Sequence, residues 1–191
     1  MSTQESQSIM QNYTVDQIFS KEEIDNIKEL YEKSECRLAH QDYNLFGVEK
    51  RHVRSQDYTP EIHRLNEYAG MKSMGHYFVK YELDSFTRLH VDNDKEVGKT
   101  IVTLVETNDL VGGETLVYDV YPKQPRPKNK YAKRKDGEVN YDKDIVPLIV
   151  PLEDGDSVIY DHNVKHGVCK VHQGYRIVLV SWYGKADSTS G

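Results

Sequence analysis

The chain has 191 residues, a formal net charge of −6, a hydrophobic content of 37% and a mean hydropathy of −0.73. This length suits one domain with a real core. The sequence contains no run of 18 apolar residues, so we expect no membrane span. The acidic balance disfavours a dedicated nucleic-acid-binding protein. The first residues lack the basic start and apolar core of a secretory signal, and two cysteines, Cys36 and Cys169, make a poor disulfide framework. We therefore expect a cytoplasmic protein.

A helical region is predicted first along the chain. Ser20 and Glu23 form a capping-box signature, and the apolar residues behind them recur at helical spacing. The predicted buried face of this helix consists of Ile24, Ile27, Leu30 and Tyr31. The stretch TPEIHRLNEYAG predicts a second helix, with a proline near its start and a glycine past its end.

From residue 75 onward the pattern changes to short β-branched and aromatic segments, which predict strands. The segments are GHYFVKYEL, KTIVTLVETND, GGETLVYDVY, DIVPLIVPL, DSVIYD, HGVCKV and YRIVLVSWY. Turn signals separate them at Asn108-Asp109, Gly112-Gly113, Asp154-Gly155 and Gln173-Gly174. Many short strands at close spacing indicate a sandwich or barrel. We expect an α+β chain in one domain, with residues 1–74 mainly helical and a jelly-roll-like core over residues 75–184.

An inserted loop is predicted at residues 121–144, between two strands of this core. Within it, residues 123–135 (KQPRPKNKYAKRK) hold seven Lys or Arg and no acidic residue. Such a run is typical of a solvated loop. The alternative is a basic flap that meets an anionic substrate or partner.

The motif RLHVDND places a histidine and an aspartate two residues apart, at His90 and Asp92. On a strand, residues i and i+2 point to the same face, so an imidazole and a carboxylate would project side by side. These are two thirds of a facial iron site, which needs a second histidine from elsewhere in the chain. The pair alone is weak evidence for a metal.

A candidate for the second histidine is His166, which opens a strand followed by a predicted turn and a return strand. In the return strand the side-chain period of two puts Arg176, Val178, Val180 and Trp182 on one face. An arginine buried there needs an anion, and its planar fork suits a carboxylate. A structural ion pair with one of the 31 acidic residues is the alternative reading.

Two other histidines lie near His166 in the sequence. The four-residue spacing of His162 and His166 would suit a helix, but the flanking segments read as strands and Asn163 is a poor residue for a helix interior. His172 shares the parity of His166 but lies at the predicted turn. It is therefore the second choice as a ligand.

Taken together, these motifs resemble those of the Fe(II)- and 2-oxoglutarate-dependent dioxygenases, in particular the prolyl 4-hydroxylase branch. The resemblance covers residues 75–184. The matching elements, in order, are Tyr81, His90-x-Asp92, Gly112-Gly113-Glu114-Thr115, His166-Gly167, Gly174-x-Arg176 and Trp182. The resemblance implies a double-stranded β-helix of the jelly-roll or cupin type, with the N-terminal helices packed on its major sheet.

The resemblance also implies residue roles. Fe(II) would be bound by His90, Asp92 and His166, which leaves three positions for the cosubstrate and O2. Arg176 would bind the distal carboxylate of 2-oxoglutarate, with Tyr81 and Thr115 as further candidates for binding this cosubstrate. Trp182 would line the substrate pocket, or fill the core.

The chain departs from the family pattern at two positions. Collagen-type prolyl hydroxylases usually carry a lysine where this chain has Arg176, which weakens the case for a collagen-like substrate. Some relatives carry a tyrosine where this chain has Thr87, so the substrate can be placed differently.

The reaction implied is oxidative decarboxylation of 2-oxoglutarate to succinate and CO2, coupled to hydroxylation of an unactivated C–H bond, with ascorbate as the expected reductant. A prolyl or similar side chain in a peptide or protein is the leading substrate, and a free amino acid or small metabolite is the alternative. A nucleic-acid substrate is disfavoured, since that branch has a further arginine downstream and this chain has none after Arg176. A non-catalytic cupin-like binding module is the remaining alternative.

Overall fold

The computed structural model describes residues 12–36, 44–92, 96–118 and 147–184. The predicted insertion at residues 121–144, with its basic run at 123–135, lies outside these residues. Of the helices in the described ranges, none is both long enough and apolar enough to cross a membrane.

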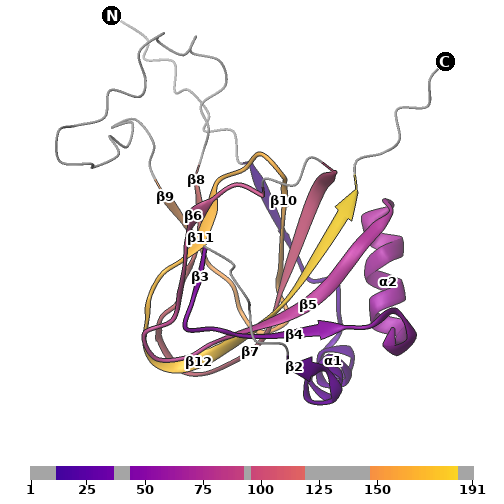
Figure 1. The fold of residues 1–191 in the computed structure, drawn as a ribbon, viewed down its shortest axis with the longest axis horizontal. Helices are drawn as coiled ribbons and strands as arrows, with labels where there is room; N and C mark the ends of the chain where they lie inside the picture. The colour runs from indigo at the N-terminus through magenta and orange to yellow at the C-terminus, as the bar shows by residue number, and fades with distance from the viewer. Residues whose placement is uncertain (1–11, 37–43, 93–95, 119–146, 185–191) are drawn as a thin grey trace, which may run out of the picture.

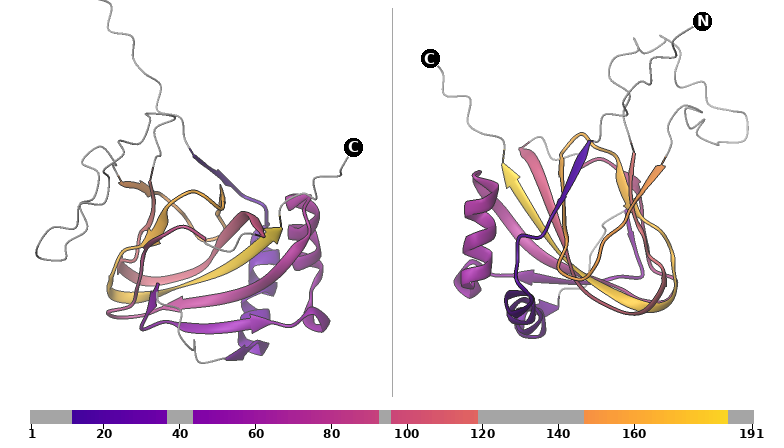
Figure 2. Two further views of the ribbon diagram at one scale, coloured as in Figure 1. Left: turned by 45° about the horizontal axis from the view of Figure 1, so that its top comes forward. Right: turned by 180° about the vertical axis from the view of Figure 1, so that it is seen from behind.

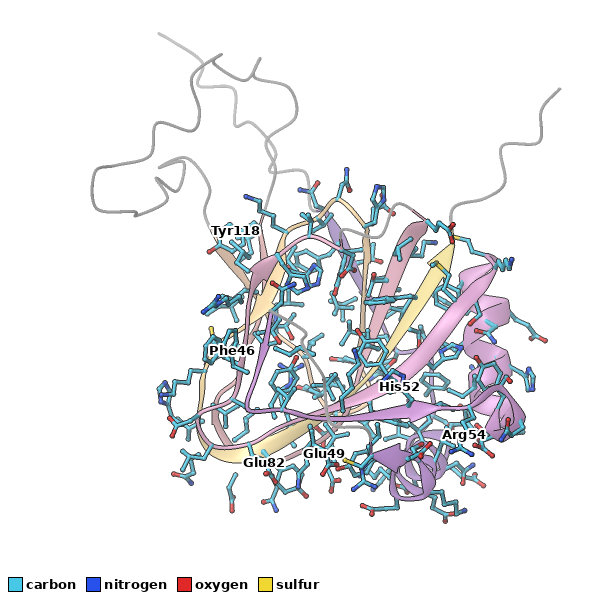
Figure 3. The ribbon with its side chains drawn as sticks, viewed as in Figure 1. Phe46, Glu49, His52, Arg54, Glu82 and Tyr118 are labelled. Atoms are coloured by element: carbon cyan, nitrogen blue, oxygen red, sulfur yellow. The ribbon has the colours of Figure 1, made fainter. Side chains whose placement is uncertain are left out.

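In the part of the chain that the structure describes, two antiparallel sheets face each other, and two helices lie against the outer side of the larger one (Figures 1 and 2). The larger sheet has seven strands, in the spatial order β1 (Tyr13–Asp16), β10 (Ser157–Asp161), β7 (Val97–Gly112), β12 (Val171–Gly184), β5 (Ser73–Tyr81), β4 (Glu49–Val53) and β2 (Glu35–Cys36). The smaller sheet has five, in the order β3 (Leu45–Phe46), β6 (Phe86–His90), β11 (His166–Val168), β8 (Thr115–Tyr118) and β9 (Pro147–Val150). Figure 3 shows Phe46 and Tyr118 on the side of the smaller sheet, and His52 and Arg54 on that of the larger sheet. The predicted α+β jelly-roll architecture is confirmed.

Both helices form as their sequences predict. Helix α1 (Lys21–Lys33) starts with a capping box, in which Ser20 and Glu23 each accept a hydrogen bond from the other's backbone N–H. Helix α2 (Pro60–Ala69) has proline in its first turn and ends at Gly70 in the left-handed conformation. A single 3-10 turn (Ser55–Asp57) precedes α2. The four residues predicted for the buried face of α1 are all buried.

The strand β12 shows how the larger sheet serves two compartments. Its residues Ile177 and Leu179 pack with the helices in the outer hydrophobic core. Its residues Val178 and Val180 face the other way, toward the smaller sheet. Because both faces of this strand are covered, its central part is buried throughout.

Several details differ from the sequence predictions. The segment before residue 75 was expected to be mainly helical, but it also contributes β1 to β4 and the start of β5. The turn predicted at Gln173-Gly174 lies instead between Val168 and Val171, and β12 runs through Gly174.

Gly174 marks a bulge in β12 rather than a turn. Its φ of +69° is in the left-handed region, and the register with β7 shifts on both sides of Gln173. A Cβ at this position would lie 2.0 Å from the carbonyl oxygen of Asn108. Strand β7 likewise continues through Asn108 and Asp109, where a turn was expected. The close approach of two backbones therefore explains this glycine.

Candidate metal centre

Three side chains with metal-binding atoms meet between the sheets. His90 is the last residue of β6 and pairs in register with His166, the first residue of β11. Asp92 follows β6 by two residues and is 9% exposed. Its Oδ1 lies 3.7 Å from Nε2 of His90 and 3.8 Å from Nε2 of His166. One ligand atom from each of the three residues lies within 4.8 Å of the other two.

The smaller sheet is irregular beside these residues. His90 and Asp92 were expected to share the face of one strand, but β6 ends at His90. Its register with β11 also shifts between His166 and Val168. Bulges of this kind re-aim side chains beside functional sites. Asp92 therefore reaches the cluster from the segment after β6 and not from within the strand.

Backbone carbonyl groups fix the tautomer of both imidazoles. Nδ1 of His90 lies 2.8 Å from the carbonyl oxygen of Arg88, and Nδ1 of His166 lies 3.0 Å from that of Val164. A carbonyl oxygen only accepts, so each Nδ1 carries the proton and donates it. Each neutral ring then presents an Nε2 lone pair, which is the arrangement found in histidines that bind metals.

The electrostatic surroundings favour the neutral form of His166. Burial lowers the pKa of this imidazole to about 4, although the nearby carboxylate of Asp92 opposes the shift. The adjacent His90 adds to the lowering. The ring of His166 is therefore deprotonated at Nε2 over the neutral pH range, where a metal ion does not have to displace a proton from it.

Two neighbours of the cluster were not found by sequence reasoning. Thr100, in β7, donates a 2.7 Å hydrogen bond to Oδ2 of Asp92, and both residues are buried. The ring of Tyr160, in β10, lies 4.5 Å from that of His166 between centroids. Burial raises the pKa of the Tyr160 phenol well above its ordinary value. Threonine and tyrosine are common strand residues, so nothing in the sequence marked them.

Arg176 projects from β12 into the same interior and is 3% exposed. Its guanidinium donates to the carbonyl oxygen of Gly113 and to Oγ1 of Thr115, the latter at 3.1 Å. Its Nε–H has no partner among the described residues, and no described acidic side chain forms an ion pair with it. Burial lowers the pKa of this guanidinium. The site therefore holds a buried cation that has no anionic partner among the described residues, and burial of a charge is costly without one.

The remaining predicted site residues surround the same space. Tyr81 shares a 2.7 Å hydrogen bond with Thr87, and Arg176 lies 5.7 Å from the Tyr81 ring centroid. Trp182 packs edge to face against Tyr77, with ring centroids 5.4 Å apart. All four residues of the predicted face of β12 line this space.

These groups enclose a cavity of about 180 Å³ between the sheets. This volume is below the range of roughly 300–1,000 Å³ usual for drug-sized ligands, so it suits a small molecule. The cavity wall includes His90, Asp92, His166, Arg176, Tyr81, Thr115 and Trp182. The structure thus gathers every predicted site residue around one cavity, from five strands and the segment after β6.

The second-choice ligand His172 is not part of this cluster. It lies in β12, near the bulge at Gly174, and its side chain is exposed. His162 lies between β10 and β11 and is half-buried, in a turn rather than a helix. Neither belongs to the group of metal-binding side chains found among the described residues.

Comparison with solved structures identifies the architecture. A 2OG-Fe(II) oxygenase family oxidoreductase from Burkholderia pseudomallei superposes with a TM-score of 0.62 at 14% identity, over 92% of this chain and 86% of that one. A prolyl-4-hydroxylase from Pseudomonas putida gives 0.62 at 14% identity, over 93% and 94% of the two chains. This chain has the double-stranded β-helix fold of the 2-oxoglutarate- and iron(II)-dependent oxygenases. HygX from Streptomyces hygroscopicus, solved with nickel, 2-oxoglutarate and hygromycin B, gives 0.64 at 12% identity, over 92% and 84%.

Searches at the level of sequence find no relative. No protein-family model and no curated protein matches the chain. At 12–14% identity, the double-stranded β-helix is what these solved structures share with it. A shared fold does not establish a shared function.

Proposed function

We propose that this chain is an Fe(II)- and 2-oxoglutarate-dependent dioxygenase that hydroxylates an unactivated C–H bond. The single observation that carries the proposal is the composition of the cavity wall. Two imidazoles and a carboxylate converge at one place, and a buried guanidinium without an acidic partner among the described residues lines the same cavity.

The donor set fits Fe(II). Two histidines and one carboxylate form the facial triad of non-haem iron oxygenases, in which three positions stay open. In this proposal His90 and His166 bind through Nε2, and Asp92 binds through Oδ1. The hydrogen bonds at both Nδ1 atoms hold the rings in the orientation that this requires.

The rest of the wall fits a small dicarboxylate. Arg176 would bind the distal carboxylate of 2-oxoglutarate, where its unpartnered Nε–H would find an acceptor. The hydroxyl of Thr115 accepts from that guanidinium, and the ring of Tyr81 lies beside it, so both residues would help to form the anion site. Charge-assisted hydrogen bonds of this kind are stronger than neutral ones.

When bound, iron(II) and 2-oxoglutarate would supply the O2 chemistry: the cosubstrate would lose CO2 and take up one oxygen atom to become succinate, and the other oxygen atom would be inserted into the C–H bond of the substrate. The chain's own residues orient the reactants and exclude water. Val178 and Val180 form an apolar wall between Arg176 and Trp182 and keep that side of the cavity dry. Ascorbate as the reductant stays a prediction.

The substrate we propose is a prolyl or similar side chain in a peptide or protein. The part of the cavity next to Trp182 and Tyr77 is aromatic, and Arg176 is the only Lys or Arg among the described residues that line the cavity. An uncharged ring suits such a wall better than a charged metabolite does. A structural neighbour from Trichoplax adhaerens, with a TM-score of 0.59, is a prolyl hydroxylase in complex with a hypoxia-inducible-factor peptide fragment.

A small metabolite is the second candidate substrate. The cavity is small, and the neighbour HygX was solved with the small molecule hygromycin B. Mass spectrometry of a peptide panel and a metabolite panel after incubation separates the two candidates. A gain of one oxygen atom in only one panel decides between them.

We further propose that residues 1–191 act as one oxygenase domain.

The reaction class is tested by succinate formation from 2-oxoglutarate in the presence of Fe(II) and ascorbate. The wild-type chain should form succinate, and His166→Ala should abolish it. His63→Ala is the matched control, because His63 is exposed on α2, outside the cavity wall, and this variant should match the wild type. No turnover by the wild-type chain with any panel would favour the alternative of a non-catalytic cupin-like module.

A further inference from the structure

Thr100 differs from the other polar residues of the cavity in what it contacts. Its hydroxyl donates to Oδ2 of Asp92 at 2.7 Å, which leaves Oδ1 as the oxygen that faces both histidines. Because an ionised carboxylate only accepts, Thr100 must be the donor. Thr100 is 1% exposed, so no bulk water replaces this hydrogen bond.

The three candidate ligands are oriented in different ways. The imidazoles of His90 and His166 are held by carbonyl groups of their own backbone, two residues earlier in each case. A side-chain substitution at Arg88 or Val164 leaves the accepting carbonyl group in place. For Asp92, in contrast, the hydrogen bond found among the described residues comes from the side chain of Thr100.

The position of Thr100 is itself rigid. It lies near the start of β7, paired with Tyr160 of β10 on one side and with Trp182 of β12 on the other. Since register partners share a face, all three side chains point into the cavity, and all three line it. A donor on a strand held on both edges is well suited to fix a ligand in place.

We infer that Thr100 is a positioning residue that holds the Asp92 carboxylate so that a single oxygen faces the metal site. Without it, the carboxylate is free to rotate and to offer both oxygens, which would occupy a position that the cosubstrate or O2 needs. The inference rests on the proposed metal site and adds to it a residue outside the ligand set.

The test is a titration of the purified full chain with Co²⁺ alone. Calorimetry measures the affinity, and visible absorption measures the spectrum of the bound ion. Thr100→Val removes the hydroxyl at nearly constant volume and should weaken Co²⁺ binding about 10- to 100-fold. It should also change the absorption spectrum, because the carboxylate contact changes. Thr100→Ser keeps the donor and should restore both the affinity and the spectrum.

Thr103→Val is the matched control. Thr103 lies in the same strand, is fully buried, and forms a 2.7 Å hydrogen bond with Ser157 of β10. This hydrogen bond lies on the face of the larger sheet that points away from the cavity. This variant loses an equivalent buried hydroxyl without touching Asp92, so its Co²⁺ binding should match the wild type. If Thr100→Val does not fold by circular dichroism, Thr100→Ala removes the same donor and decides the question.

The outcomes separate the inference from the proposed function. If the wild type and Thr100→Val bind Co²⁺ with the same affinity and spectrum, Thr100 has no positioning role, although the metal site stands. If Thr103→Val weakens binding as much as Thr100→Val does, the effect is one of general packing and the inference fails. If the wild-type chain binds no Co²⁺, the metal site and the inference fail together.

Discussion

At the scale of single residues, Arg176 is a buried cation whose proposed anion is 2-oxoglutarate. We expect Arg176→Ala to raise the 2-oxoglutarate concentration needed for half-maximal succinate formation by roughly a hundredfold. The loss of hydrogen bonds to a charged group is worth on the order of 2–3 kcal/mol, and each 1.4 kcal/mol is a factor of ten. Steady-state kinetics with varied 2-oxoglutarate measure this change.

Metal binding should survive the same substitution, because Arg176 lies outside the three-residue cluster. Arg54→Ala is a suitable control, since Arg54 is exposed, forms an ion pair with Glu35 and lies outside the cavity wall. Joint loss of metal and cosubstrate binding in Arg176→Ala would contradict the role proposed for this residue.

The sequence predicts which residues gather around the cavity, but not how they are held. His90, Asp92 and His166 were found through their types and order in the chain. The contact of Thr100 with Asp92 could not be found in this way, because it joins the segment after β6 of the smaller sheet to β7 of the larger sheet. Contacts between facing sheets depend on strand register and bulges, and neither is encoded in a short motif.

At the scale of elements, the capping box of α1 should contribute measurably to stability. Ser20→Ala removes the side-chain acceptor for the backbone N–H of Glu23, and we expect a loss of about 1 kcal/mol. Urea denaturation measures the change in the free energy of unfolding. The control is Ser55→Ala in the exposed 3-10 turn, which should change stability far less. An equal effect of both substitutions would exclude a specific capping contribution.

The elements themselves differ in how well they could be predicted. Helix α1 was predicted together with its buried face, because its apolar residues recur with a period close to 3.6. The bulge at Gly174 was misread as a turn, because glycine serves both conformations. Only the nearby backbone of Asn108 distinguishes them, and that contact joins residues far apart in the sequence.

At the scale of the whole molecule, His76 should make stability depend on pH. It lies between the larger sheet and α2, where its ring nitrogens contact Ser73 and Ser181. Burial lowers its pKa from 6.5 to about 4. Between these two pH values the unfolded chain binds more protons than the folded chain, so stability falls as the pH falls through this range. The loss should be on the order of 3 kcal/mol.

Urea denaturation of His76→Gln at pH 7, 6, 5 and 4 measures this contribution. The variant is expected to be less stable than the wild type at pH 7, because glutamine fits the buried site poorly. Its stability should then decline less steeply toward pH 4. His63→Gln, on the exposed side of α2, should keep the wild-type slope. Parallel curves for the wild type and His76→Gln would rule out His76 as the origin.

The division of the cavity between the two sheets has a consequence for ligand choice. The candidate metal ligands belong to the smaller sheet or follow its strand β6, whereas Arg176 belongs to the larger one. A dicarboxylic acid bound at both ends would span the distance between the two sheets. That distance would then select the number of carbon atoms between the two acid groups. A homologue one methylene shorter or longer would be rejected by the distance between two walls, whatever its chemistry.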